Sequence, residues 1–192
     1  MKILQWLYFF QARFLQIINK NHMAINAFNM ALKVNPDFGL ANGCLGHLYA
    51  SLGQPRLAEH YFNEALRIKP NDAVIFYNLG YIYETQKKFE EAIAVFQKSV
   101  QLNPKNDRAW YGMGLCHASL NRHDEAARAL EQAAVLQPLS PYPWYHLGMA
   151  YHTLDNRKKV DEVIAHLNTF DPKVTRKLIN DTSSAGTQQC LN

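Results

Sequence analysis

The chain of 192 residues has few cysteines and few glycines, and each scarcity excludes a class of site. Its three cysteines, Cys44, Cys116 and Cys190, lie far apart and form no CxxC pair, which excludes a disulfide framework or a cysteine-rich zinc site and fits a reducing compartment. The nine glycines do not gather in a loop. The sequence therefore offers no glycine-rich phosphate-binding loop.

Charge and long apolar runs are scarce as well. Charged residues make up 19% of the chain, and the densest basic cluster is Arg157, Lys158 and Lys159. A net charge of +4 without a longer basic run does not call for a nucleic-acid partner. The apolar start, Ile3–Phe10, is too short to span a membrane. We therefore expect a cytoplasmic protein, or one peripheral to a membrane complex.

The eight histidines do not form a metal or catalytic pattern. His117 and His123 are six residues apart, as are His146 and His152, and this spacing does not place a pair on one helical face. No HExxH sequence is present. We predict no metal, no cofactor and no catalytic residues, and hence that the chain is not an enzyme.

What the chain does have is an internal repeat. Its prolines carry the period in equal steps at Pro36, Pro70, Pro104, Pro138 and Pro172. Three further positions keep the same step: a small residue at Ala24, Ala58, Ala92 and Ala126; a large one at Phe28, Phe62, Phe96, Leu130 and Ile164; and a glycine or alanine at Ala12, Gly46, Gly80, Gly114 and Gly148. A period of this length is typical of stacked helical repeats.

Each repeat predicts two amphipathic helices. In the third, Phe76, Leu79, Gly80 and Tyr83 recur at helical spacing, and the stretch from Ala92 to Ser99 does the same. Between the two helices stand residues that tolerate the left-handed backbone conformation, at Asn19, Gly53, Lys87, Asn121 and Asp155.

The repeat also predicts how its helices begin and pack. We expect the side chains of Asp37, Asp72, Asn106 and Ser140 to cap the first helices. We expect glycine on the first helix and alanine on the second to let the helix axes approach, with the large residue filling the space beside the crossing.

The combination of an aromatic residue, Leu-Gly, Tyr, Ala, Phe, Ala and Pro at these positions resembles the tetratricopeptide repeat (TPR). Phe76–Pro104 is close to the consensus, and Trp110–Gly114 and Trp144–Gly148 are similar. The resemblance implies an all-α fold, a right-handed α-solenoid of tandem helix-turn-helix hairpins.

The predicted repeats span residues 5–38, 39–72, 73–106, 107–140 and 141–174. Residues 175–192 are predicted to form a short capping helix and, from Asp181 onward, a flexible tail. The first is divergent, since Gln11 and Ala12 replace Leu-Gly. The fifth is divergent because Val160 and Leu167 are larger than alanine, so we expect its hairpin to pack more loosely or at a different angle.

TPR proteins commonly bind a partner segment on the concave face formed by their first helices. By family phase, the predicted groove consists of Tyr77, Asn78, Tyr81, Arg108, Tyr111, Tyr142, Tyr145, His146, Met149 and His152. Tyrosine offers a large contact area and a hydroxyl, which suits recognition of a peptide or helix. A carboxylate clamp, used by some TPR co-chaperones, is not predicted, because Gly43, His47 and Gly112 stand where further donors are needed.

The first predicted helix is more apolar than the end of a stack requires. Leu7, Tyr8 and Leu15 are expected to face their own hairpin. Trp6, Phe9, Phe10 and Phe14 are then either partly buried against the second repeat or left to contact another protein, a second copy or, less favoured, a membrane surface.

Two functions remain open at this point. The chain is a scaffold, adaptor or assembly factor that holds a partner segment in its groove. Alternatively, it is a permanent structural subunit of a larger, perhaps membrane-associated complex, docked through the first helix. No nucleic-acid partner is expected in either case.

Overall fold

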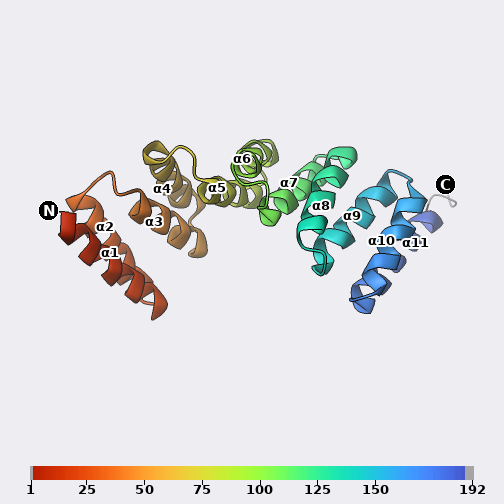
Figure 1. The fold of residues 1–192 in the computed structure, drawn as a ribbon, viewed down its shortest axis with the longest axis horizontal. Coiled ribbons are helices and arrows are strands. Elements are labelled where there is room, and N and C mark those ends of the chain that lie inside the picture. The colour runs from red at the N-terminus through yellow and green to blue at the C-terminus, as the bar shows by residue number, and fades with distance from the viewer. Residues whose placement is uncertain (1, 189–192) are drawn as a thin grey trace. The chain divides into compact units, whose positions relative to one another are not determined.

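The described part of the chain is built of helices alone. A computed structural model describes the backbone of residues 2–188 and the side chains of residues 3–183. Within this range the helices fall into two compact units, residues 1–87 and residues 88–192 (Figure 1). The first unit contains α1 (Lys2–Ile17), α2 (Asn21–Val34), α3 (Gly39–Ser51), α4 (Pro55–Ile68) and α5 (Ala73–Thr85). The second contains α6 (Phe89–Leu102), α7 (Asp107–Ser119), α8 (His123–Leu136), α9 (Pro141–Thr153), α10 (Arg157–Asn168) and α11 (Pro172–Gln188).

The helix bounds confirm the period that the prolines predict. The first helices α3, α5, α7 and α9 begin at Gly39, Ala73, Asp107 and Pro141, and the second helices from α2 to α10 begin at Asn21, Pro55, Phe89, His123 and Arg157. The turns between first and second helices are left-handed where the sequence predicts it. Backbone φ lies between 55° and 68° at Asn19, Gly53, Lys87, Asn121 and Asp155.

Close approach of a glycine to a large side chain closes the hairpins. A methyl group at Gly46 on α3 would lie 2.5 Å from Cδ1 of Phe62 on α4, and one at Gly114 on α7 would lie 2.6 Å from Cγ of Leu130 on α8. Both large side chains are almost completely buried. The predicted packing is therefore confirmed in these two hairpins, because no other residue type leaves room for the partner.

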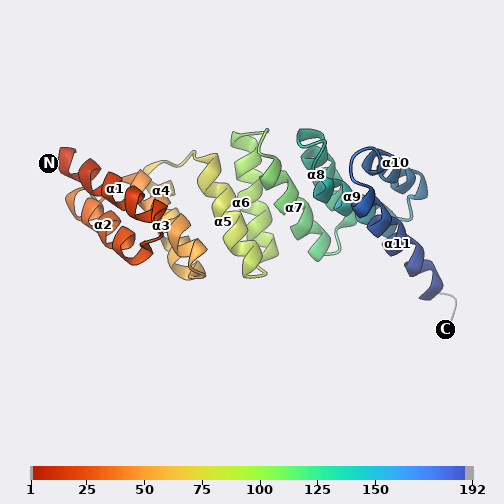
Figure 2. The same ribbon diagram turned by 90° about the horizontal axis from the view of Figure 1, so that it is seen from below.

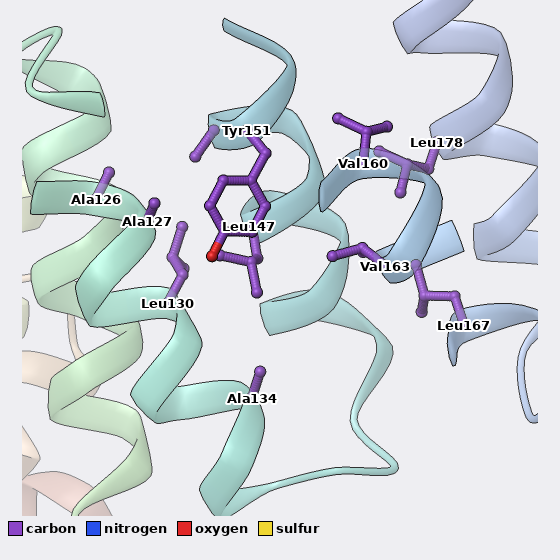
Figure 3. Close-up of a cluster of buried hydrophobic side chains, with 11 residues drawn as sticks. Ala126, Ala127, Leu130, Ala134, Leu147, Tyr151, Val160, Val163, Leu167 and Leu178 are labelled. Atoms are coloured by element: carbon purple, nitrogen blue, oxygen red, sulfur yellow. The ribbon is translucent and has the colours of Figure 1, made fainter. Parts of the chain in front are cut away.

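Each unit has its own apolar core. In the first unit, Ala12, Leu15, Phe28 and Leu45 belong to a buried cluster shared by α1, α2 and α3. In the second unit, α8 faces α9 through Leu130 and Leu147, while Val160, Val163, Leu167 and Leu178 cover the other side of α9 (Figure 3). The two cores are alike in alternating alanines with large side chains.

The fifth hairpin differs from the others in the side chains that surround its glycine. Val160 and Leu167 are fully buried, but Val163 replaces Ile164 as the residue buried against α9. Beside Gly148, a methyl group would meet Cδ2 of Leu178 at 2.7 Å before Cγ1 of Val163 at 3.3 Å. Part of the space that the second helix fills in other repeats is thus filled by α11.

The chain after residue 174 corrects the predicted short helix and tail. Helix α11 begins at Pro172, where Oδ1 of Asp171 accepts hydrogen bonds from the backbone N–H groups of Lys173 and Val174. It packs against α9 and α10 and then extends beyond them to Gln188 (Figure 2). The expected tail is therefore helical over 181–188. Contacts of Asp181 and the buried Thr182 explain the difference, since both occur beyond the predicted end. Residues 189–192, with Cys190, lie outside the described residues.

The helix caps are only partly as predicted. Asp72 accepts hydrogen bonds from the N–H groups of Val74 and Ile75, and Asn106 accepts one from Ala109. Asp37 does not cap α3, because the repeat places Phe38 at that position, and its carboxylate instead accepts a bond from Arg67 at 2.6 Å. Ser140 makes no cap bond with its side chain.

The sequence of α9 removes one of the two amides that the Ser140 side chain could bond as a cap. An N-cap side chain accepts from the second or third amide of its helix. The third residue of α9 is Pro143, which has no N–H group, so only the second amide, that of Tyr142, is left as a donor, and it makes no bond to the Ser140 side chain. Two tryptophan side chains hold the loops before α7 and α9, which the sequence did not predict. Nε1 of Trp110 donates a hydrogen bond to the carbonyl oxygen of Pro104 at 3.0 Å, and Nε1 of Trp144 donates one to that of Pro138 at 2.9 Å.

Replacing Gly114 by leucine tests the closeness of the hairpin. We expect Gly114→Leu to lower the free energy of unfolding by about 1–3 kcal/mol, since the side chain would overlap Leu130. Gly43→Leu is the matched control, because a methyl group there meets only Cδ1 of Ile75, at 3.2 Å. Urea unfolding followed by circular dichroism measures both, and equal losses would contradict this packing.

The caps predict a second contrast, between equivalent positions two repeats apart. We expect Asp72→Ala to destabilise the protein by about 0.5–2 kcal/mol at neutral pH, while Ser140→Ala has a smaller effect because no cap bond is lost. Burial opposes ionisation of Asp72, yet Lys69 and the two amides together hold the pKa of its carboxyl below the ordinary value.

The same shift predicts a pH dependence. A lowered pKa means that the stabilisation by Asp72 is present above the ordinary carboxyl pKa and is lost as the pH falls through the lowered value. The difference in urea midpoint between wild type and Asp72→Ala should therefore shrink in acid. A difference that grows as the pH falls would contradict this assignment.

Candidate protein-binding groove

A hollow of about 760 Å³ lies in the first unit between α3, α4 and α5. We call it the first hollow. Its lining is mostly apolar and consists of Arg13, Gln16, Phe38, Gly39, Leu40, Gly43, Cys44, His47, Ala65, Ile68, Lys69, Asp72, Val74, Ile75 and Asn78. First helices of successive repeats thus form two of its sides.

Two glycines keep the first hollow open. Gly39 and Gly43 stand one helical turn apart on α3, and their Cα atoms leave the side chains of Ile68 and Ile75 accessible. A methyl group at either glycine would approach these isoleucines to 3.3 and 3.2 Å. The hollow therefore has an apolar wall that a partner's side chain is able to reach.

A smaller hollow of about 380 Å³ occupies the same repeat position in the second unit. We call it the second hollow. It is lined by Asp107, Arg108, Tyr111, Ala133, Gln137, Ser140, Tyr142 and Pro143, and each of these stands two repeats after a lining residue of the first hollow. Tyr111 takes the place of Gly43, so a ring fills space that is open in the first unit. The second hollow is consequently smaller and richer in hydroxyl groups.

The basic side chains that line the first hollow differ in whether a carboxylate already pairs with them. Lys69 donates to Asp72 at 2.9 Å, and the same carboxylate also caps α5. Arg13 lies within salt-bridge distance of no carboxylate among the described residues, and it donates to Oε1 of Gln16 at 3.2 Å. Burial raises the pKa of the nearby Cys44 thiol, while Arg13 acts in the opposite direction. The hollow is therefore apolar with a basic edge.

The structure brings together only part of the predicted groove residues. In the first unit Asn78 lines the first hollow, Tyr77 is half-buried and Tyr81 is exposed. In the second unit, Arg108, Tyr111 and Tyr142 line one hollow.

The remaining predicted residues lie on α9. The ring centres of His146 and Tyr111 are 5.8 Å apart. Burial is the main cause that lowers the pKa of His146, and the positive charge of Lys177 lowers it further. Met149 packs against the buried cluster of the second unit, and His152 is half-buried. These two residues line neither hollow.

Tyr145 makes a contact within its own unit. Its hydroxyl donates to Oδ2 of Asp181 on α11 at 2.6 Å, and Nζ of Lys177 lies 4.5 Å from the centre of its ring. Burial, together with the hydrogen bond to Asp181 and its negative charge, raises the pKa of Tyr145 to about 12. The hydroxyl predicted to meet a partner therefore holds α11 against α9.

Residues from other elements also line the first hollow, and the sequence did not predict them. Arg13 comes from α1, Ile68 and Lys69 from α4 and the residue after it, and Phe38 from the loop before α3. The predicted groove contained only residues at the repeat positions of the first helices that line the concave face in TPR proteins. Residues on second helices and loops were not included. The sequence did contain a sign of the first hollow. Gly39 and Gly43 are smaller than the residues at the same positions of the other repeats, which indicates open space beside α3.

The first helix also differs in detail from its prediction. Phe9 is half-buried, and its ring contacts those of Phe28 and Phe38 at 5.7 and 5.3 Å. Leu7, expected to face the hairpin, is 62% exposed. Phe10 and Phe14 are exposed as predicted, while Trp6 is partly covered by Phe38.

Two further properties concern the described residues only. None of their helices is both long enough and apolar enough to cross a membrane. Nor do three or more of their His, Cys, Asp or Glu side chains gather where a metal ion would be held.

Helical hairpins repeated at a constant period, with glycines at the crossings and left-handed turns, define a TPR α-solenoid. The family model described as "Tetratricopeptide repeat" matches residues 19–73, 44–107, 77–143 and 118–157. The chain therefore belongs to the tetratricopeptide repeat family. TPR proteins in general bind other proteins or peptides, and the fold supports a role in protein–protein interaction or assembly.

Solved structures of other TPR proteins share this fold. A structure of MamA is 22% identical, with 96% of each chain covered and a TM-score of 0.78. YrrB, a TPR protein with an unusual peptide-binding site, is 23% identical over 90% of each chain, with a TM-score of 0.78. PilF of Pseudomonas aeruginosa is 17% identical over 98% of this chain and 90% of its own, with a TM-score of 0.76. No curated protein shows significant sequence similarity to the chain.

The contact between Tyr145 and Asp181 predicts how α11 is held. We expect Tyr145→Phe to speed amide hydrogen exchange in α11, because the bond to the carboxylate is lost. Tyr142→Phe is the control, since Tyr142 is 65% exposed on the same helix. Hydrogen exchange with mass spectrometry distinguishes the two, and unchanged protection in Tyr145→Phe would contradict the role of this bond.

Proposed function

We propose that the chain is a scaffold, adaptor or assembly factor that holds a segment of another protein against the first helices of its repeats. The observation that carries this proposal is the recurrence of a hollow at the same repeat position in both units. Packing within the hairpins alone explains the recurrence of small and large residues, but it does not require an open space beside them. The peptide-binding site of the similarly folded YrrB is consistent with such a role.

Each of the two hollows suits a different kind of chemical group. In the first, Leu40, Ile68 and Ile75 suit an apolar side chain, and Arg13 suits a carboxylate beside it. In the second, Arg108, Tyr111 and Tyr142 suit polar side chains or a peptide backbone. We propose that Tyr77, Asn78, Tyr81 and His146 add to these surfaces, and that Tyr145, Met149 and His152 do so only at their exposed edges.

The chemistry of the hollows favours binding over catalysis. The first hollow contains one thiol, Cys44, and burial keeps its pKa raised, which is the reverse of what an activated nucleophile needs. We infer that the chain is not an enzyme and that it needs no cofactor. We also infer that it acts in the cytoplasm, where a free thiol such as Cys44 is stable.

Site-specific crosslinking tests the proposed groove. A photo-crosslinking residue at Leu40 or Tyr142 should capture a defined partner in the native cell, identified by mass spectrometry. The same residue at the exposed Lys98 on α6, a second helix, is the positional control. Gly43→Leu, which fills the first hollow, should reduce capture from Leu40 at least about tenfold. Equal capture from Lys98, or no effect of Gly43→Leu, would contradict the groove.

A second candidate function is a permanent place in a larger, perhaps membrane-associated complex, docked through α1. The exposure of Phe10 and Phe14 on α1 favours it. Co-purification at fixed stoichiometry that withstands high salt would support this candidate. Rapid exchange of the partner would support the first one.

A further inference from the structure

Helix α1 carries a stripe of exposed apolar side chains. Ile3, Leu7, Phe10, Phe14 and Ile17 are each between 62% and 85% exposed. They follow one another at steps of four, three, four and three residues, so they share one face of the helix. We call this face the α1 stripe. Such contiguous exposure is unusual for an apolar set of this size.

The opposite face of α1 holds the hairpin together. Ala12 and Leu15 are buried against α2, and the ring of Phe9 lies between those of Phe28 and Phe38. At about 100° per residue, these positions point away from the α1 stripe. The stripe is therefore not needed to close the first hairpin, and its exposed area is on the order of 500 Å².

The spacing of the stripe selects a helix as its occupant. Alternating steps of three and four residues are the a and d pattern of a coiled-coil seam, which receives the side chains of a second helix between its own. An extended strand presents side chains at a period of two and does not match this pattern. A helical partner is thus favoured over an extended peptide.

Charge selects the kind of helix. The stretch from Met1 to Pro36 contains no Asp or Glu, while Lys2, Arg13 and Lys20 within it are basic. Arg13 stands beside the stripe on α1 and has no carboxylate within salt-bridge distance among the described residues. Acidic residues flanking the seam of a partner helix would complement this surface.

The other occupants fit less well. A second copy would bring two acid-free basic hairpins together, and the stripe offers less than the roughly 800 Å² per partner of a standard interface. A helix that lies on a membrane turns a polar face to water, whereas the inner face of α1 is covered by its own hairpin. We propose that the α1 stripe binds an amphipathic helix of another protein, with apolar residues at three- and four-residue steps and Asp or Glu beside them.

This inference deepens the second candidate function by naming the chemistry of the partner, and Arg13 is the one residue that it shares with the groove proposal. It is tested with three synthetic helical peptides of about 21 residues, or three heptads. All carry the same composition of leucine and isoleucine. One has glutamate at the flanking positions, one has lysine there, and one has glutamate with the apolar residues out of register. Binding to the full chain is measured by fluorescence anisotropy.

Two variants separate the stripe from the groove. Phe10→Ser/Phe14→Ser removes apolar contact at exposed positions, so the fold is retained, and Val135→Ser on α8 is the matched control at 64% exposure. Circular dichroism verifies the helix content of each. Gly43→Leu fills the first hollow and leaves the stripe intact.

We expect the glutamate-flanked peptide to bind at least about tenfold more tightly than the lysine-flanked or out-of-register peptide. Phe10→Ser/Phe14→Ser should weaken its binding at least about tenfold, whereas Val135→Ser and Gly43→Leu leave it unchanged. Arg13→Glu/Lys20→Glu should reverse the preference toward lysine flanks.

Four results would overturn the inference. They are equal binding of the acidic and basic peptides; loss of binding in Gly43→Leu but not in Phe10→Ser/Phe14→Ser; binding to vesicles of anionic lipid and to none of the three peptides; and stripe-dependent dimerisation, seen by sedimentation, without peptide binding. The first two leave the groove proposal untouched, because that proposal is tested by crosslinking from Leu40 and Tyr142.

Discussion

The distance between the two helices of a hairpin is the constraint on which the described fold depends. Where Gly46 faces Phe62 and where Gly114 faces Leu130, there is no space for even one more carbon atom. This contact fixes how closely first and second helices pack, and the remaining side chains of each hairpin are placed accordingly. Gly39 and Gly43 precede Gly46 by seven and three residues on the same face of α3, and both line the first hollow. A close hairpin and an open hollow are thus produced by glycines on one face of one helix.

The fold was largely predictable from the sequence, because repetition makes weak signals strong. A single Gly or Pro says little, but the same residue type at every repeat step fixes the helix type, the turns and the buried positions. The cap predictions failed where residue type was preferred to the repeat position. Asp37 looked like a cap by residue type, yet the lattice placed the cap at Phe38. Ser140 satisfied both criteria, but Pro143, the third residue of α9, lacks one of the two N–H groups that a cap side chain bonds.

The site was less predictable than the fold. Family phase named residues on first helices, and Arg108, Tyr111 and Tyr142 do share a hollow. It did not indicate that the hydroxyl of Tyr145 would meet Asp181, because Asp181 lies in a segment that sequence composition assigned to a tail. Nor did it find Ile68, which reaches the first hollow from a second helix. Contacts outside the repeat register depend on three-dimensional packing that no periodic pattern encodes.

The left-handed turns have a consequence for how the sequence tolerates change. Surface turns normally accept substitution freely, since their side chains meet only water. Here Asn19, Lys87, Asn121 and Asp155 are exposed, yet each holds a positive φ that costs a β-branched residue far more than asparagine or glycine. The outermost residues of the hairpins are therefore among the more restricted in choice. In a library of random variants, valine, isoleucine and threonine should be depleted at these four solvent-facing positions, although no neighbouring side chain would exclude them.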